Sequence, residues 1–319
     1  MNICIFGAGS LGCLFAAYLA RGGLNVSIVA RTPYADAVKS SGLEIHRVFD
    51  GGTFHVDDVF VIEAMEELRD FDLVILAVKA FDVKGVLKQF LDADVIDPSR
   101  QVIGLLQNGL GVEDMAREFF PRLPILRITT TNGALIESPG IVNHTGSGDV
   151  CMGFWDDIVF PSSGEMLDAV VGALVDAGMR AEICSEMREK VWQKVIVNAG
   201  INPVGAIFKI PNGYIMDAPA LLLISDQLTD EAVSVATKGD FIADFDGRAA
   251  VHGVIDMTRA NRNSMLQDLE KGRMTEIDFI NGAIARHGHE LGVATPMNDA
   301  VVEILHGYHE LGGLCDTEL

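Results

Sequence analysis

Short apolar runs alternate with longer helix-like stretches along the first part of the chain. The runs that fit buried strands are NICIF (2–6), VSIVAR (26–31), DLVILAVKA (72–80) and QVIGLLQNG (101–109). Between them lie SLGCLFAAYLAR (10–21), which stops at two glycines, and FDVKGVLKQFL (81–91), both typical of helices. Strands that alternate with helices in this way predict a parallel sheet with helices on both faces.

The pattern changes from about residue 125. Glycine and proline turns separate strand-like segments up to residue 154, and one more helix and strand fit residues 164–184. No strand candidate remains after about residue 185. Helical periodicity is found instead in 187–201, 218–238, 253–271, 275–292 and 296–312. We therefore predict an α/β Rossmann-type domain over residues 1–185, followed by an all-α domain over 186–319.

A glycine-rich turn joins the first predicted strand to the first predicted helix. The turn consists of Gly7, Ala8, Gly9, Ser10, Leu11 and Gly12, which is a GxGxxG pattern. The first glycine permits the tight turn, the second lets the backbone approach a pyrophosphate, and the third lets the helix pack closely on the strand. The positive end of the helix also favours anionic phosphates. Because the pattern lies between a strand and a helix, it predicts a dinucleotide site rather than a chance cluster of glycines.

The residue after the second strand indicates which dinucleotide binds. An NAD site usually has an acidic residue there, which accepts a hydrogen bond from a ribose hydroxyl. This chain has Arg31 instead, and no acidic residue lies in VSIVARTPY. A guanidinium can pair with the 2′-phosphate of NADP, whereas a carboxylate would repel it. A solvated surface arginine is the alternative interpretation, and we favour NADP(H).

Two further polar residues follow predicted strands. Lys79 ends one apolar run and Asn108 ends the next. Ligands bind beyond the carboxyl ends of parallel strands, so both side chains are candidates for the nicotinamide end of the cofactor. A surface lysine and a turn asparagine before glycine explain the same positions equally well.

A polar stripe runs along one helix of the second domain. Lys194, Asn198 and Asn202 are four residues apart, so they share one face of a helix that is otherwise apolar. One cation with two uncharged carboxamides is typical of a cleft wall, where each group needs a partner, rather than of a solvated face. Pro203 is expected to bend or end this helix near Asn202.

Three more candidates lie further along the chain. Asn261 and Ser264 are three residues apart on one predicted helix, and Glu276 lies near the start of the next, behind a cap at Thr275. Acidic residues are common in the first turn of helices, so Glu276 alone is weak evidence of a site.

Composition and charge exclude several classes of protein. A net charge of −21 over 319 residues argues against nucleic acid or an anionic membrane as a partner. The five scattered cysteines (Cys4, Cys13, Cys151, Cys184 and Cys315) form no metal-binding pattern, so we expect reduced thiols, no bound metal and a cytoplasmic location. Strand-like residues begin at Asn2, so no signal peptide is expected. The sequence leaves the oligomeric state open, and a homodimer is one of the candidates.

Several longer motifs in combination give a specific resemblance. The chain resembles the ketopantoate reductases (2-dehydropantoate 2-reductases) over nearly its whole length. The motifs are FGAGSLG (6–12), QNG (107–109), KVIVNAGINP (194–203), PNG (211–213), SMLQD (264–268), TEIDFINGAI (275–284) and GVATPMND (292–299). One departure is Asn263, where the family often has a second serine beside the one that matches Ser264.

The resemblance implies an NADPH-dependent reduction of ketopantoate to (R)-pantoate, a step of pantothenate synthesis, with a small 2-oxo acid as substrate. It implies that Lys194 is the general acid and that Glu276 works beside it. It further implies that Lys79 and Asn108 lie near the nicotinamide and the substrate. The residues that it implies for substrate binding are Asn198, Asn202, Asn212, Asn261 and Ser264. Two alternatives stay open: a reductase of another branched 2-oxo acid, and an NADP-binding sensor without turnover.

Overall fold

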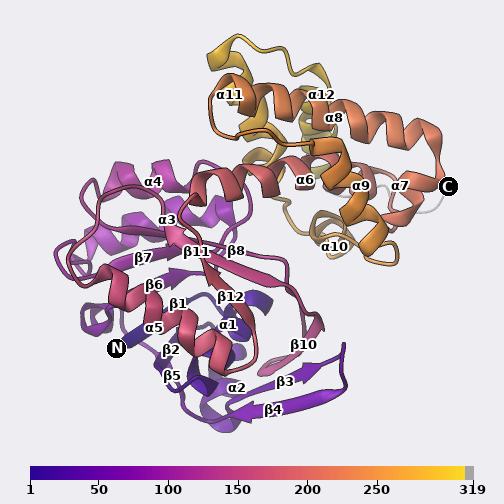
Figure 1. The fold of residues 1–319 in the computed structure, drawn as a ribbon. Helices are drawn as coiled ribbons and strands as arrows, with labels where there is room; N and C mark the ends of the chain where they lie inside the picture. Colours follow the sequence, from indigo (N-terminus) through magenta and orange to yellow (C-terminus); the bar gives the residue numbers. More distant parts are fainter. Residues whose placement is uncertain (313–319) are drawn as a thin grey trace. The chain divides into compact units, whose positions relative to one another are not determined.

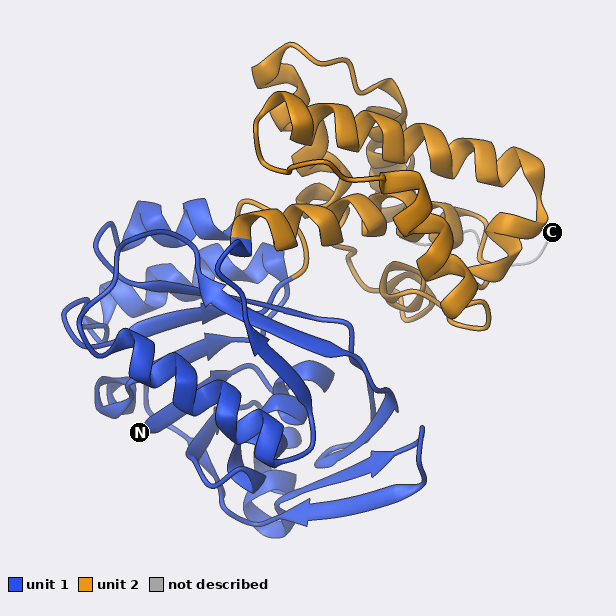
Figure 2. Cartoon of the chain, in the orientation of Figure 1, with its two compact units in different colours: residues 1–107, 112–187 blue, residues 108–111, 188–319 orange. Residues whose placement is uncertain are grey.

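A computed structural model of the chain describes residues 1–312. The chain forms two compact units, which Figure 2 shows in different colours. The first unit contains residues 1–107 and 112–187, and the second contains residues 108–111 and 188–319. The short segment 108–111, about a third of the way along the sequence, thus belongs to the second unit, although the residues on both sides of it belong to the first.

An eight-stranded sheet forms the centre of the first unit (Figure 1), in the order β12-β11-β8-β7-β6-β1-β2-β5. The strands are β1 (Asn2–Phe6), β2 (Asn25–Val29), β5 (Val59–Ile62), β6 (Leu73–Leu76), β7 (Val102–Leu105), β8 (Ile125–Thr130), β11 (Asp149–Phe154) and β12 (Arg180–Ile183). The six strands from β8 to β5 are parallel, and β11 runs antiparallel to β8. Strand order reverses beside β1, which is where ligands bind in sheets of this class.

Helices cover both faces of this sheet. The helices of the first unit are α1 (Ser10–Arg21), α2 (Tyr34–Ser41), α3 (Ala80–Asp92), α4 (Val112–Phe119) and α5 (Ser163–Asp176), and a 3-10 turn, η1, spans Met65–Asp70. Helix α1 packs against α5, and α3 packs against α4. This layered α/β arrangement confirms the predicted Rossmann-type fold of the first part of the chain.

A second sheet in this unit was not predicted in full. It has four strands in the order β4-β3-β10-β9, namely β3 (Leu43–Arg47), β4 (Gly52–Val56), β9 (Gly133–Ser138) and β10 (Ile141–Gly146). The sequence pattern predicted strands for β9 and β10 but indicated no strand between residues 43 and 56. All four strands pack against α1, and Leu43, Ile45 and Val142 join the core of the unit.

Helices make up the second unit wherever residues 188–312 have regular structure. They are α6 (Met187–Ile207), α7 (Gly213–Asp217), α8 (Pro219–Lys238), α9 (Gly247–Met257), α10 (Ser264–Glu270), α11 (Asn281–Leu291) and α12 (Pro296–Glu310), with the 3-10 turn η2 (Ile277–Phe279). The prediction of a helical second domain is confirmed, but the single helix expected over 253–271 is two helices, α9 and α10. Within residues 1–312, no helix combines the length and the apolar character that crossing a membrane requires.

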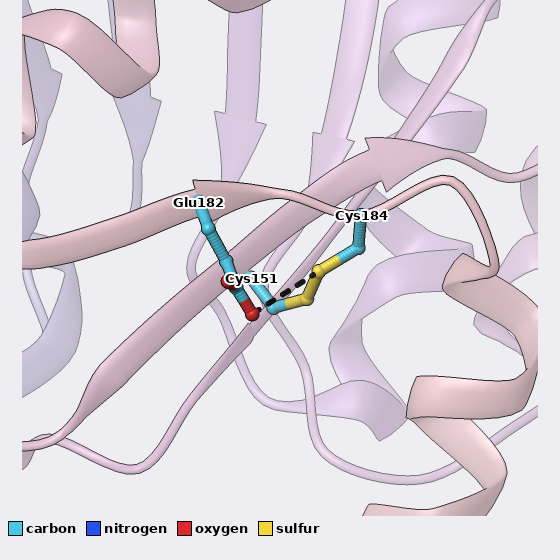
Figure 3. Close-up of side chains that lie close together, drawn as sticks. All are labelled: Cys151, Glu182 and Cys184. Atoms are coloured by element: carbon cyan, nitrogen blue, oxygen red, sulfur yellow. Dashed lines mark hydrogen bonds between the residues drawn. A yellow bond between two sulfur atoms is a disulfide. The ribbon is translucent and has the colours of Figure 1, made fainter.

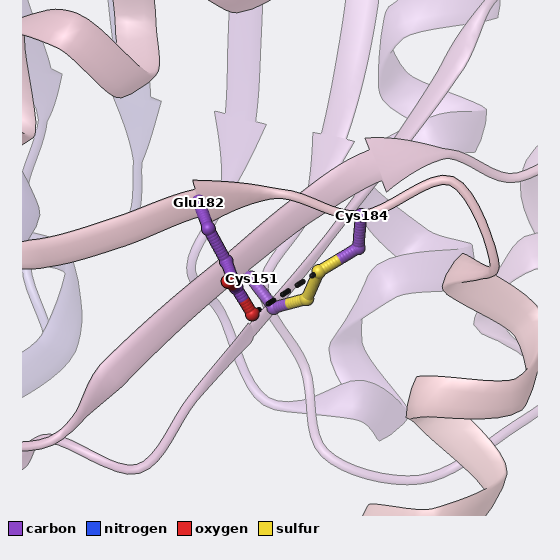
Figure 4. The surroundings of a disulfide bond; sticks show 3 residues. All are labelled: Cys151, Glu182 and Cys184. Carbon is purple, nitrogen blue, oxygen red and sulfur yellow. Dashed lines mark hydrogen bonds between the residues drawn. A yellow bond between two sulfur atoms is a disulfide. The ribbon is translucent and has the colours of Figure 1, made fainter.

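The cysteines differ from the sequence prediction at one pair. Cys151 on β11 and Cys184, directly after β12, form a disulfide, with Cα atoms 5.9 Å apart (Figures 3 and 4). The expectation of reduced thiols was wrong for this pair, because the pairing of β11 with β12 brings together residues 33 positions apart. Glu182 Oε1 lies 3.9 Å from the Cys184 sulfur. These three side chains could together hold a metal ion, but the disulfide occupies both sulfurs. Cys4 and Cys13 are free and buried, and Cys315 lies outside the described residues.

Candidate active site

The three glycines of the turn after β1 meet different structural requirements. Gly7 has a φ of +119°, and a Cβ on it would approach Val78 Cγ1 at 3.0 Å. A Cβ on Gly12 would collide with the carbonyl oxygen of Gly7, so glycine is needed for the close approach of α1 to the strand. Around Gly9 the nearest atom to an added Cβ is Ala77 O at 3.8 Å. Packing among the described residues therefore does not require glycine there, which fits close approach of a ligand.

The carboxyl ends of three neighbouring strands are level with one another. Phe6 pairs with Leu76, and Leu76 pairs with Leu105. The glycine turn directly follows Phe6. Lys79, which is half-buried, lies three positions after Leu76 and is the N-cap residue of α3. Lys79 and the glycine turn therefore leave the same edge of the sheet, at the reversal of strand order.

Arg31 lies two residues beyond β2, the strand next to β1. Val29 at the end of β2 pairs with Phe6, so Arg31 also leaves the sheet at the edge with the glycine turn. Its side chain is exposed and has no hydrogen bond or ion pair with any residue that the structure describes. The backbone is fixed, because the Arg31 carbonyl accepts hydrogen bonds from the amides of Tyr34 and Ala35. This guanidinium is therefore available to an anionic group.

The polar stripe of the second unit lies on α6. Lys194 and Asn198 are half-buried, and Asn202 is 5% exposed. The carboxamides of Asn198 and Asn202 form no side-chain hydrogen bond within the described part of the chain. Both groups can donate and accept hydrogen bonds. The stripe therefore combines a cation with two carboxamides that are free to bind a ligand.

Helix α6 does not end at Pro203, although the sequence predicted a bend or an end near Asn202. The helix continues to Ile207. Proline has no amide hydrogen, so the carbonyl of Ala199, four residues earlier, lacks its usual helical donor. The Nδ2 atom of Asn281 on α11 lies 3.3 Å from that oxygen and donates to it. A side chain of another helix thus replaces the missing backbone bond and holds α6 beside Asn198.

Asn212 belongs to a cluster near the end of this stripe. Its Nδ2 donates to Thr258 Oγ1 at 2.9 Å, and Asn263 Nδ2 lies 3.5 Å from its Oδ1. Asn263 Nδ2 also lies against Gly205, where any Cβ would collide with it. Gly205 is three residues beyond Asn202 and so lies on the same side of α6. The asparagines at positions 202, 212 and 263 therefore gather around one end of α6.

Asn261 and Ser264 do not share a helix, contrary to the prediction. Asn261 lies in the turn after α9, and Ser264 is the first residue of α10. The helix is interrupted because Asn263 caps α10, where its side chain accepts a hydrogen bond from the amide of Leu266 at 3.0 Å. The carbonyl of Asn261 accepts from the amide of Asn212 at 3.0 Å, which joins this turn to the Asn212 cluster. Both Asn261 and Ser264 are exposed.

Glu276 and Asn108 lie on backbone segments that are bonded to each other. Glu276 is 7% exposed and is the N-cap residue of η2, where its carbonyl accepts from the amide of Phe279 at 3.0 Å. The carbonyl of Phe279 in turn accepts from the amide of Leu110 at 2.8 Å. Segment 108–111 therefore joins the second unit at η2, close in sequence to Glu276. Thr275 bonds His309 Nε2 through its hydroxyl rather than capping the turn.

The candidate residues form two sets, one in each unit. The set in the first unit consists of residues 7–12, Arg31 and Lys79, and the set in the second consists of Asn108, Lys194, Asn198, Asn202, Asn212, Asn261, Ser264 and Glu276. Sequence reasoning missed Thr258 and the hydrogen-bonding role of Asn263. The signal for Asn263 was its place directly before an apolar helix, which is where N-cap residues occur.

Comparisons with known proteins agree with this architecture. The family described as "Ketopantoate reductase PanE/ApbA" matches residues 3–157, and its C-terminal part, "Ketopantoate reductase PanE/ApbA C terminal", matches residues 186–309. A 2-dehydropantoate 2-reductase of Archaeoglobus fulgidus is 34% identical, over 95% of this chain and 96% of that protein. One of Vibrio cholerae is 31% identical over the same shares of the two chains.

Solved structures give the same picture of the fold. A PanE/ApbA family ketopantoate reductase of Ralstonia eutropha superposes with a TM-score of 0.86 at 23% identity, over 98% of this chain and 100% of the other. D-mandelate dehydrogenase, in a ternary structure with NADH and anilino(oxo)acetate, gives a TM-score of 0.85 at 26% identity, over 98% and 100%. On the sequence matches, the chain belongs to the PanE/ApbA family of ketopantoate reductases.

Proposed function

We propose that the protein reduces 2-dehydropantoate to pantoate with NADPH. The observation that supports this most is the stripe on α6, where Lys194 precedes two carboxamides with no partner among the described residues. Reduction of a 2-oxo acid needs a proton donor for the carbonyl oxygen, and the hydroxyl group of 2-dehydropantoate can be held by neutral hydrogen-bonding groups. The curated relatives described above are named 2-dehydropantoate 2-reductase, so another branched 2-oxo acid is not favoured as the substrate.

The first unit offers a fitting site for a dinucleotide. Gly9 leaves its backbone open at the N-terminus of α1, a helix long enough to present a positive end to a pyrophosphate. Lys79 adds a cation at the same edge of the sheet. When bound, NADPH supplies the hydride that reduces the carbonyl carbon. D-mandelate dehydrogenase, which has this fold, is a relative whose structure contains NADH.

We assign the preference for NADPH over NADH to Arg31. Its exposed guanidinium has no partner among the described residues and lies at the end of β2, where an acidic residue would select NAD. A guanidinium pairs well with a phosphate, because both hydrogen bonds of a bidentate contact are charge-assisted.

The second unit would supply the groups for the substrate. Lysine is protonated at neutral pH, so Lys194 can stabilise negative charge on the carbonyl oxygen and then donate a proton to it. Glu276 would favour the charged form of that lysine. Asn198 and Asn202 would hold the hydroxyl group of the substrate, because a carboxamide both donates and accepts without adding charge.

The carboxylate of the substrate would be bound by side chains at the start of α10. Ser264 and Asn261 have exposed side chains at the start of α10, and both can donate hydrogen bonds. Asn212 and Asn108 would complete the set. In this assignment residues 1–185 bind the cofactor, and residues 186–319 provide most of the substrate groups.

An assay of the purified protein tests the proposal. Oxidation of NADPH is followed with 2-dehydropantoate and with a panel of other branched 2-oxo acids, and each substrate is repeated with NADH. We expect the highest kcat/KM for 2-dehydropantoate with NADPH. A higher kcat/KM for another 2-oxo acid would make that acid the proposed substrate in place of 2-dehydropantoate. Tight binding of NADPH without turnover of any substrate would support a sensor instead.

Location and assembly complete the proposal. We propose a cytoplasmic enzyme that binds neither nucleic acid nor membranes, in line with its net charge of −21. We further propose a homodimer. Light scattering of the purified protein measures the assembly, and a mass equal to one chain would contradict it.

A further inference from the structure

Gln107 holds the ends of two neighbouring strands together. It follows β7 and is 5% exposed. Its side-chain Nε2 donates to the carbonyl oxygens of Leu76, at 2.8 Å, and Val78, at 3.0 Å, which lie at and just beyond the end of β6. This orientation of the carboxamide is required, since a carbonyl oxygen can only accept a hydrogen bond. Its Oε1 is buried and has no hydrogen-bond partner in residues 1–312, so the two donors account for a glutamine at this position.

The backbone of Gln107 is fixed by a buried ion pair. Arg127 Nη1 donates to the carbonyl oxygen of Gln107 at 2.7 Å and to that of Leu105 at 3.0 Å. Its Nε bonds the carboxylate of Glu113, and these two side chains are 1% and 2% exposed. A buried ion pair is a weak source of stability but can specify one local conformation. Gln107 is therefore held through its backbone while its side chain holds the neighbouring segment.

The segment that Gln107 holds forms one side of the glycine turn. Val78 N lies 3.1 Å from where a Cβ of Gly7 would be, and Val78 Cγ1 lies 3.0 Å from it. The next residue is Lys79, the N-cap residue of α3. A shift of the Val78 peptide would therefore displace both the turn and the lysine.

We propose that Gln107 is a positioning residue for the dinucleotide, because its two amide donors fix the segment 77–79 against the glycine turn and so aim Lys79 at the cofactor. The inference rests on the proposed function, since it concerns the cofactor of that reaction. Gln107 itself contacts no reacting atom in this account and acts through Lys79.

The substitution Gln107→Glu tests this with little change in shape. An ionised glutamate at this position would place an oxygen against two carbonyl oxygens, whereas a protonated one keeps a single donor. The charged groups on the segments bonded to Gln107 are Arg127, Glu113 and Lys79. The Kd for NADP⁺ is measured by calorimetry for both proteins at pH 6 and pH 8.5. We expect the ratio of variant to wild type to be about tenfold at the higher pH and smaller at the lower.

Gln101 provides a matched control at the opposite end of the same strand. It is likewise buried, and its Nε2 donates to the carbonyl oxygens of Leu68 and Phe71, both at 2.8 Å. Gln101→Glu therefore makes the same chemical change away from the glycine turn. We expect its Kd for NADP⁺ to stay within about twofold of wild type at both pH values. An equal loss in both variants would overturn the inference, because it would show a general loss of structure.

A double-mutant cycle with Lys79→Ala tests whether Gln107 acts through the lysine. If it does, Gln107→Glu weakens NADP⁺ binding less in the Lys79→Ala protein than in the wild type. Additive effects would overturn this assignment. Should Gln107→Glu fail to fold, Gln107→Met replaces it, since it removes both donors without adding charge. Its loss of affinity is expected to be the same at both pH values, and unchanged affinity would overturn the inference.

The outcomes separate this inference from the proposed function. A wild type that binds NADP⁺ but reduces no 2-dehydropantoate contradicts the proposed function, and the Gln107 comparison still decides the inference. A wild type that does not bind NADP⁺ overturns both. Normal turnover together with unchanged affinity in Gln107→Glu overturns the inference alone.

Discussion

The Arg31 guanidinium is exposed at the edge of the sheet with no partner among the described residues. Arg31→Ala should therefore raise the KM for NADPH by about 10–100-fold, the loss expected for hydrogen bonds to a charged group, and leave the KM for NADH nearly unchanged. Steady-state kinetics with both cofactors measure this. Arg122→Ala is a matched control, because Arg122 is also exposed but precedes β8 at the opposite edge of the sheet. Equal rises for NADPH and NADH would contradict the assignment.

His144 links α1 to the second sheet and should make stability depend on pH. Its Nδ1 lies 3.0 Å from Tyr18 Oη, and its Nε2 lies 2.8 Å from Asn132 Oδ1. Burial lowers the pKa of His144 below its ordinary value near 6.5. As the pH falls, His144 is therefore protonated in the unfolded chain before it is protonated in the folded protein. The contribution of His144 is fully present above pH 6.5 and is lost as the pH falls from there through the folded pKa.

Unfolding in urea between pH 5 and pH 8 measures this effect. We expect the free energy of unfolding to fall below pH 6.5 by up to about 1.4 kcal/mol per pH unit from this one group. His144→Gln should lose that part of the pH dependence. The other seven of the eight histidines are present in both proteins, so the difference between the two curves isolates His144. Parallel curves would contradict the prediction.

Residue patterns predicted side chains that share an element, but not pairs that depend on tertiary contacts. Lys194, Asn198 and Asn202 were found because spacing along a helix is a local property. The Cys151–Cys184 disulfide was missed, because only the pairing of β11 with β12 brings the two residues together. The sequence places Gln107 only within a motif, since its two acceptors lie at and just beyond the end of another strand.

Helix α6 depends on α11 at the point where Pro203 interrupts its hydrogen bonding. Asn281→Ala removes the donor to the Ala199 carbonyl and should destabilise the protein by about 1–3 kcal/mol. Pro203→Ala restores a backbone amide for that carbonyl. The cost of Asn281→Ala should therefore be smaller in the Pro203→Ala protein. Urea denaturation of the four proteins measures the coupling, and strictly additive energies would rule it out.

Elements with strong periodicity were predicted well, and weakly patterned ones were not. Strands β6 and β7 of the central sheet are continuous apolar runs, which is typical of buried parallel strands. Strands β3 and β4 mix polar and apolar residues (LEIHR and GTFHV), and β3 pairs with β10 almost a hundred residues later. The helix expected over 253–271 was divided by the Asn263 cap, a signal weaker than the surrounding helical pattern.

Over the whole molecule, the proposed reaction needs groups from both compact units. The glycine turn, Arg31 and Lys79 belong to the unit that would bind the dinucleotide, and Lys194 with the asparagines belongs to the helical unit. The two functions should therefore be separable by substitution. A change at Lys194, Asn198 or Asn202 should alter turnover without altering cofactor binding, and a change at Arg31 should alter cofactor binding first.

Lys194→Ala tests this division and the proposed chemistry most directly. We expect kcat for 2-dehydropantoate to fall by about 10²–10⁴-fold, the usual worth of a general acid, while the Kd for NADP⁺ stays at the wild-type value. Lys190→Ala is the control, because Lys190 is an exposed lysine one turn earlier on α6, and its kcat should be unchanged. A Lys194→Ala protein that turns over at the wild-type rate would contradict the account.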